Sequence, residues 1–251
     1  PCIRALYKNA QDKGCDVKLL DPLPDISGSN ADLNTFRGMF KTDLNEEERP
    51  LRILYTDKQL NTPIHKGMYG NPSVGATTFL TAIKQRNKKN TKLNDFFNAL
   101  QDTTTTHQIV IVASVCGGTG SGGTPAILTE LTEGMTKDNR KYNVRVTLIA
   151  MLPWFQLLTA PISDPDDPLV EDTEMLHNSY STVEYLRTKF ANTDNIRIIF
   201  VGPNWERPGI TTTGNLNQPI NPHYIHLVSA NIAGKCLSET IDKFEKGIYG
   251  Y

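Results

Sequence analysis

The chain has 251 residues, of which 38% are hydrophobic, with 18 glycines and 15 prolines, and this fits one large α/β domain or two small ones; we expect a single domain over residues 1–251. A net charge of −1 leaves no electrostatic footprint for nucleic acid, and no apolar run reaches the roughly 18–20 residues of a membrane span. The four cysteines form no CxxC pair, so neither a zinc site nor a disulfide framework is expected. We therefore expect a cytoplasmic protein with no direct nucleic-acid binding and no membrane contact.

Apolar spacing and β-branched runs predict helices alternating with strands. The predicted elements are, in chain order, a helix at Pro1–Lys13, strands at Asp16–Leu20 and Leu51–Thr56, helices at Val74–Gln85 and Leu93–Leu100, a strand at Gln108–Val115, a helix at Pro125–Met135, a strand at Val144–Met151, a helix at Glu174–Phe190, a strand at Ile196–Val201 and a helix at Tyr224–Lys246. Continuous apolar strands are typical of parallel sheets that are covered on both faces. The alternation predicts a three-layer, Rossmann-like α/β fold, with a parallel sheet between helices.

A glycine-rich segment follows the predicted strand that ends at Val115. It reads Gly117, Gly118, Thr119, Gly120, Ser121, Gly122, Gly123. Ligands of parallel α/β sheets lie at the carboxyl ends of the strands, which is where this segment falls. Its glycines let the backbone approach oxygen atoms, its N–H groups attract anions, and two hydroxyls add donors. We expect a phosphate site here, the alternative being a tight turn without a ligand.

Two common nucleotide motifs fit this chain poorly. The P-loop needs GxxxxGK[ST], but the only Gly-Lys pair, Gly234-Lys235, falls inside a predicted helix, and Ser229 stands where the first glycine belongs. The dinucleotide pattern GxGxxG is present in the glycine-rich segment, yet it also requires an acidic residue after the next strand. That strand runs into Met151-Leu152-Pro153-Trp154. An NAD- or flavin-binding enzyme is therefore the less favoured alternative.

The string GGTGSG at residues 117–122 resembles the signature of the tubulin/FtsZ superfamily of GTPases. Other segments resemble family motifs in the family's order, over roughly residues 16–246. They are Asp21 after a strand, near the family's magnesium; Gly70-Asn71-Pro72-Ser73-Val74-Gly75, which resembles the FtsZ pattern GNPxxG near the γ-phosphate; Asn178 in HNSYSTVEYL; Asn204 in VGPN; and HLVSA at 226–230, which resembles the start of the central helix of tubulin.

The resemblance implies binding of GTP or GDP with Mg²⁺. The implied nucleotide contacts are Gly117, Gly118, Thr119, Gly120, Ser121, Gly122, Gly70, Asn71, Pro72, Glu174, Asn178, Asn204 and Tyr224, and the implied metal contact is Asp21. It also implies head-to-tail self-association into filaments, with hydrolysis that depends on assembly. A nucleotide-sensing regulatory module that does not polymerise is the alternative.

The chain departs from the family at several positions. Ile225 stands where tubulin has a base-reading asparagine, and Leu23 stands where tubulins carry an acid. The family's first strand and first glycine loop are expected upstream of Pro1, and its catalytic acidic loop beyond Tyr251. These departures indicate a divergent bacterial or phage tubulin-like protein, whose catalytic residue the sequence does not identify.

Overall fold

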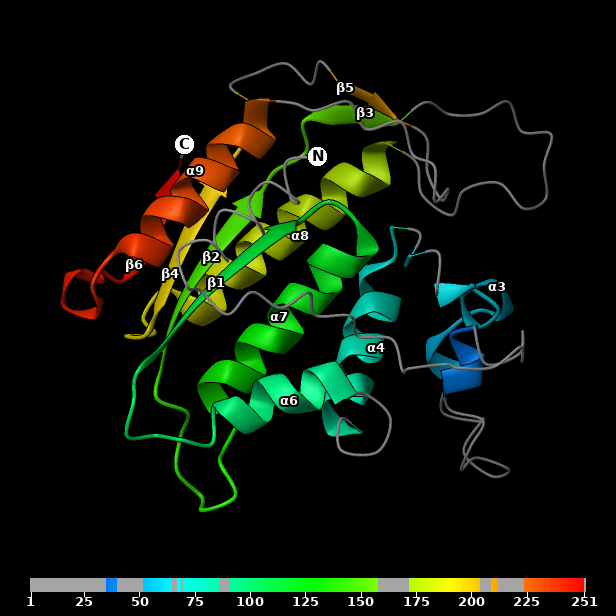
Figure 1. The fold of residues 1–251 in the computed structure, drawn as a ribbon. Helices are drawn as coiled ribbons and strands as arrows, with labels where there is room; N and C mark the ends of the chain where they lie inside the picture. Colours follow the sequence, from blue (N-terminus) through cyan, green and yellow to red (C-terminus); the bar gives the residue numbers. More distant parts are fainter. Residues whose placement is uncertain are drawn as a thin grey trace.

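The structure is a computed structural model that describes residues 35–39, 52–64, 67–68, 70–85, 91–157, 172–203, 209–211 and 224–250. Its centre is a parallel sheet of four strands in the order β1-β2-β4-β6. The strands are β1 (His107–Ser114), β2 (Val144–Met151), β4 (Ile196–Val201) and β6 (Gly247–Gly250). Helices lie on both faces of this sheet (Figure 1), so the expected α/β class with a parallel sheet is confirmed.

Four helices lie on one side of the sheet (Figure 1). They are α6 (Thr91–Ala99), α7 (Gly118–Glu133), α8 (Asp172–Phe190) and, packed against α7, α4 (Pro72–Lys84). Their apolar side chains share one buried cluster with alternate strand residues such as Val146, Leu148 and Ile198. The opposite face carries α9 (Tyr224–Ser238), which packs on Ile149 and Ile199. Because β2 and β4 are covered on both faces, most of their residues are apolar, the exceptions being Arg145, Thr147 and Arg197.

Smaller elements surround this centre. The short helices are η2 (Arg37–Met39), α3 (Asp57–Leu60) and η4 (Ile241–Lys243), and the strands β3 (Phe155–Leu157) and β5 (Gly209–Thr211) form a separate parallel pair. In Figure 1 this pair lies beyond the carboxyl ends of β2 and β4. No helix in the described ranges has the length and apolarity needed to cross a bilayer.

Most elements after residue 70 match their predicted bounds. The bounds of β2 and β4 are those predicted, and β1, α4, α6 and α8 begin and end within two residues of the prediction. The strand prediction at 51–56 is wrong, because residues 52–54 are helical and Ile53 and Leu54 are 83% and 71% exposed. The predicted elements at 1–13 and 16–20 lie outside the described residues.

Two helix predictions have one wrong end each. Helix α7 begins at Gly118, seven residues before the predicted Pro125. The prediction placed the start at Pro125 because glycine has low helix propensity and proline is favoured at a helix start. Helix α9 ends at Ser238, eight residues before the predicted Lys246, and the chain continues through η4 into β6. Strand β6 pairs with β4, a contact between segments about fifty residues apart that local pattern does not reveal.

The connection from β4 to β6 is unusual in its hand. The helices α7 and α8 connect β1 to β2 and β2 to β4 on one face, each moving one strand along the sheet. Helix α9 connects β4 to β6 in the same direction on the opposite face. This connection therefore has the opposite hand to the other two, although parallel crossovers nearly always share one hand.

Candidate functional site

The glycine-rich segment is the first turn of helix α7, not a loop that precedes it. Gly117 is the N-cap residue, and the Ser121 N–H donates to the Gly117 carbonyl at 2.8 Å, which closes the first turn. The first N–H groups of a helix have no acceptor within the helix. Among the described residues, none accepts a hydrogen bond from the N–H groups of Gly118, Thr119 or Gly120. These three amides are therefore able to bind an anion.

The first turn of α7 lies directly against the end of β1. A Cβ atom added to Gly120 would lie 1.7 Å from the carbonyl oxygen of Ser114, so only glycine fits there. Gly117 has no atom within 4 Å of an added Cβ, and its position is open. Thr119 is exposed, whereas Ser121 is buried and its hydroxyl donates to the Gly117 carbonyl at 2.7 Å. Of the two hydroxyls, that of Thr119 is the one with a hydrogen available for a ligand.

The segment Gly70–Gly75 forms the beginning of helix α4. Gly70 has a φ of 70°, which favours glycine, and the Asn71 side chain caps the helix by accepting from the N–H groups of Ser73 and Val74 at 3.1 and 3.2 Å. Pro72 occupies the first helical turn, where its missing N–H costs nothing. The N-terminus of α4 is thus capped by its own side chain, in contrast to that of α7.

Helices α4 and α7 cross in close contact at their N-terminal ends. A Cβ added to Gly75 would lie 2.0 Å from the carbonyl oxygen of Gly118, and one added to Gly118 would lie 2.5 Å from the backbone nitrogen of Asn71. A Cβ added to Gly122 would lie 2.1 Å from the carbonyl oxygen of Pro72. Each clash is with backbone, which cannot move aside as a side chain can. The two glycine motifs therefore fit one another and hold two helix N-termini side by side.

Helix α8 is joined to this pair through Asn178. Its side-chain amide donates to the Gly70 carbonyl at 2.9 Å, while its backbone carbonyl accepts from the Thr182 hydroxyl at 2.8 Å. The Asn178 side chain thus fixes the turn that precedes α4. Asn178, expected to contact nucleotide, therefore has a structural partner, and no described residue accepts from its second amide N–H.

A cavity of about 920 Å³ lies between α4, α7 and α8. Its described lining includes seven of the predicted site residues, Gly70, Asn71, Pro72, Ser121, Gly122, Glu174 and Asn178. This volume is in the range of small-molecule sites. Segments that are distant in sequence therefore meet around one space, on the flank of α7 beside its first turn. Gly117, Gly118, Thr119 and Gly120 are at the adjoining helix end and are not among the lining residues.

The described lining of this cavity includes Glu174 and no lysine or arginine. An anion near it would therefore be held by backbone N–H groups and helix dipoles, as helix N-termini allow. The carbonyl of Ser121 is a further acceptor in the cavity wall. Its usual helical donor would be the N–H of residue 125, which is a proline and has none. Sequence reasoning did not identify His177, Ser181 or Tyr185, which also line the cavity. Their spacing from Glu174 and Asn178 along one helical face would have identified them.

The remaining predicted residues are elsewhere or outside the described ranges. Tyr224, the first residue of α9, is 51% exposed and is not among the residues lining the cavity. Ile225 is fully buried between α9 and the sheet, so this departure from the tubulin motif is a core residue. Asn204 and Asp21 lie outside the described residues.

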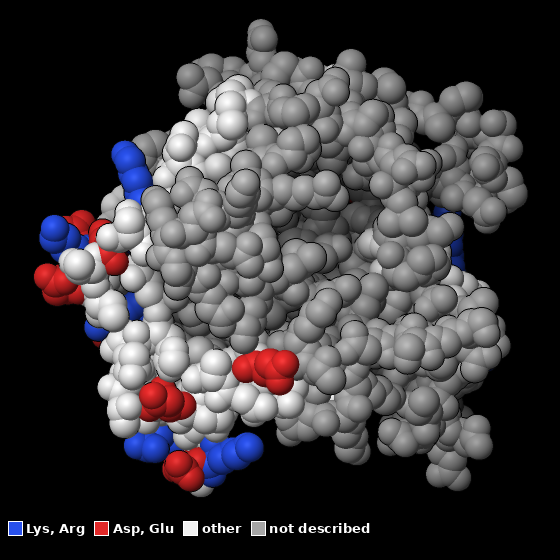
Figure 2. Space-filling model, in the orientation of Figure 1, with Lys and Arg blue, Asp and Glu red and all other residues white. Residues whose placement is uncertain are grey.

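No group of three or more His, Cys, Asp and Glu side chains in the described part of the chain is arranged to hold a metal ion. A magnesium ion that is bound mainly through phosphate oxygens needs only one or two carboxylates. Glu174 supplies one carboxylate on the cavity wall, which fits that modest requirement. On the face shown in Figure 2, acidic and basic side chains of the described residues are interspersed.

No protein-family model matches this chain, and no curated protein matches its sequence.

Proposed function

We propose that the chain binds a guanine nucleotide, with its α- and β-phosphates against the first turn of α7, and that it is a GTPase of the tubulin/FtsZ type. The observation that carries the proposal is the uncapped N-terminus of α7 at the carboxyl end of β1, beside the N-terminus of α4. Each helix places about half a positive charge at its N-terminus. Two adjacent N-termini favour a ligand with several negative charges.

Several of the described residues at these helix ends then have a role in binding. The amides of Gly118, Thr119 and Gly120 donate to phosphate oxygens, and the Thr119 hydroxyl adds a fourth donor. The Gly70–Gly75 turn lies next to these amides, where a γ-phosphate would reach it. Mg²⁺ neutralises charge between the phosphates when it is bound, and Glu174 is the described carboxylate suited to orient it or its water ligands.

The preference for guanine, the assembly and the hydrolysis rest on the resemblance alone. Asn204 is proposed to contact the base. Head-to-tail association uses two different surfaces of the same chain, so it repeats without closing and gives filaments. We propose that hydrolysis depends on this assembly, because the family completes its active site with an acidic loop of the neighbouring subunit.

The direct test is isothermal titration of the protein with GTP, GDP, ATP and NAD in the presence of Mg²⁺. GTP and GDP are expected to bind, and the Thr119→Val variant is expected to bind GTP about tenfold or more weakly, because a hydrogen bond to a charged group contributes about 1.5–3 kcal/mol. Thr188→Val, on the exposed side of α8, is the matched control and should bind as the unmodified protein does.

The outcomes separate the alternatives. Absence of GTP and GDP binding would disprove the proposal, and binding of NAD alone would favour the dinucleotide enzyme. Sedimentation of the GTP sample tests assembly. Binding without any GTP-dependent pelleting would favour the nucleotide-sensing module that does not polymerise.

A further inference from the structure

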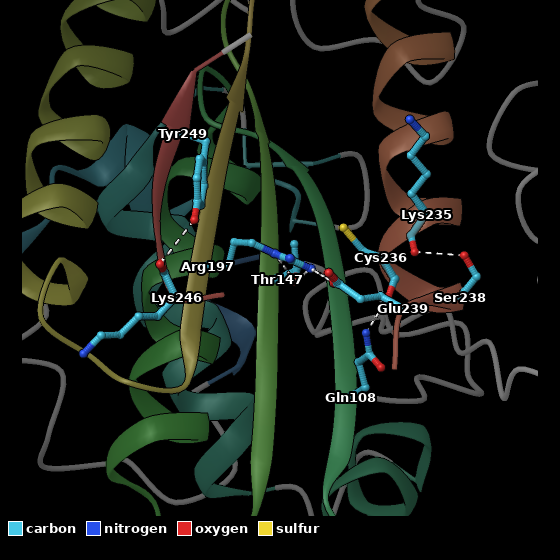
Figure 3. A network of polar contacts seen from close by, with 9 residues as sticks. All are labelled: Gln108, Thr147, Arg197, Lys235, Cys236, Ser238, Glu239, Lys246 and Tyr249. Atoms are coloured by element: carbon cyan, nitrogen blue, oxygen red, sulfur yellow. Dashed lines mark hydrogen bonds and ion pairs between the residues drawn. The ribbon is translucent and has the colours of Figure 1, made fainter. Parts of the chain in front are cut away.

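An arginine is buried on the face of the sheet that carries α9. Arg197 is the second residue of β4, and its side chain is only 10% exposed. Its Nε and Nη2 atoms donate to the Thr147 hydroxyl at 3.2 and 3.0 Å, and Nη2 pairs with Glu239 at 2.7 Å. Its guanidinium also lies 5.0 Å from the centre of the Phe244 ring. Figure 3 shows the side chain extending from β4 past Thr147 toward Glu239, just after the end of α9.

These partners do not satisfy every N–H donor of Arg197, and a second positive side chain nearby has no ion-pair partner among the described residues. A guanidinium has five N–H donors, and among the described residues no oxygen atom accepts from the Nη1 atom, although the Cys236 thiol, a weak acceptor, lies beside the guanidinium. Lys235 precedes Glu239 by four residues but forms no ion pair with it or with any other described residue. Figure 3 shows Lys235 extending along α9 away from Glu239. Arg197, Lys235 and Glu239 together therefore carry a net charge of about +1, with the Lys235 charge apart from the Arg197–Glu239 pair.

A cavity of about 380 Å³ adjoins these groups, between α9 and β4. Its described lining consists of Arg197, Ile199, Val228, Asn231, Ile232, Lys235, Cys236 and Glu239. The α9 residues recur at three- and four-residue steps, so they form one helical face. The cavity is thus lined by two basic side chains, one acidic side chain and one amide, together with apolar side chains of β4 and α9. Its volume falls at the lower end of the range for small-molecule sites.

This cavity is separate from the proposed nucleotide site. It lies on the α9 face of the sheet, whereas α7 and α8 cover the other face. Its arginine is near the amino end of β4, whereas the glycine-rich segment follows the carboxyl end of β1. Burial raises the pKa of the Cys236 thiol, although the nearby Arg197 charge opposes this.

We propose that this cavity binds a small organic anion, a carboxylate or phosphate head on a short apolar body. The Nη1 atom of Arg197 holds the head, together with Lys235 once its exposed and flexible side chain rotates toward Arg197, and the Asn231 amide supplies a further hydrogen bond. Ile199 and Ile232 contact the apolar body. An anion of this size restores charge balance and fills a space bounded by a buried cation.

The test follows the ¹⁵Nε–H signal of Arg197 by NMR in the full-length protein, without nucleotide. This N–H is hydrogen bonded to Thr147 inside the fold, and an Arg197→Lys variant assigns its signal. The probes are two anions, butyrate and butyl phosphate. Butylammonium, which has an alkyl chain of the same length but a positive charge, is the control ligand. We expect a saturable shift with at least one of the two anions, with a dissociation constant of about millimolar for ligands this small. No saturable shift is expected with butylammonium.

Lys235→Met is expected to weaken anion binding about tenfold, the usual effect of losing one ionic hydrogen bond. Lys84→Met, an exposed lysine in the last turn of α4, is the matched control and should leave binding unchanged. The proposal is wrong if neither anion gives a saturable shift, if butylammonium shifts the signal equally, or if Lys235→Met binds as tightly as the control. Because no nucleotide is present, this test is independent of the proposed function, and its outcomes can be interpreted even if the protein does not bind guanine nucleotides.

Discussion

Replacing Gly122 with alanine tests whether the glycine-rich segment serves helix packing as well as ligand binding. The new Cβ would lie 2.1 Å from the Pro72 carbonyl oxygen and 2.4 Å from the Ala76 nitrogen, both in the backbone of α4. Ordinary van der Waals contact begins near 3.4 Å, so the helices must separate by more than an ångström at their closest point. This cannot be relieved by rotating a side chain.

The expected cost is at the upper end of overpacking effects, about 3 kcal/mol or more in the free energy of unfolding. For a chain of this length, 1 kcal/mol corresponds to roughly 2–4 °C in melting temperature, so the loss is about 6–12 °C. Gly234→Ala is the matched control, because nothing lies within 4 Å of its added Cβ. That change in the interior of α9 should stabilise by about 0.5–1 kcal/mol, since alanine loses less backbone freedom than glycine on folding.

The assay is urea denaturation followed by far-UV circular dichroism, with no nucleotide present. Gly122→Ala should unfold at lower urea than the unmodified protein, and Gly234→Ala at higher urea. If Gly122→Ala is as stable as the unmodified protein but no longer binds GTP, the close crossing is not what requires the glycine. The glycine would then serve the ligand alone, and the packing argument for the motif would be refuted.

Three further predictions concern single contacts. Thr147→Val removes the acceptor of two Arg197 N–H groups and should lower the free energy of unfolding by about 2 kcal/mol in urea, and an unchanged midpoint would contradict this network. Asn178→Leu removes the hydrogen bond to the Gly70 carbonyl and should cost about 1 kcal/mol by the same assay, and no loss would mean that the turn before α4 is held by other contacts. Burial raises the pKa of Cys116, so the unfolded thiol ionises first and stability should fall as the pH rises above about 8.5. Cys116→Ser should lose that part of the pH dependence, and an identical pH profile for the two proteins would contradict the predicted shift.

Local sequence pattern determined the central strands. The continuous apolar runs of β2 and β4 gave their bounds without error, because a parallel strand covered on both faces has no polar side to obscure its ends. The same rule failed at Ile53 and Leu54, which are apolar but exposed. An apolar run predicts burial only where another segment covers it, and the sequence does not state where that is.

The residues of the candidate site were largely predictable, but their arrangement was not. The glycine-rich segment and the GNPxxG pattern are both visible in the sequence, and the structure brings them together through Gly75, Gly118 and Gly122. The sequence suggested a loop before a helix, whereas α7 begins at Gly118, because packing against α4 and β1 outweighs the low helix propensity of glycine.

The sequence by itself determined the α/β class, the positions of β1, β2 and β4, and the candidate phosphate segment, because each depends on the periodicity or composition of neighbouring residues. Only the tertiary structure decided the pairing of β6 with β4, the burial of Arg197 beside Glu239, and the two cavities on opposite faces of the sheet. Each of these depends on contacts between segments far apart in the chain. The free energy of such contacts comes from excluding water between surfaces that meet only after folding.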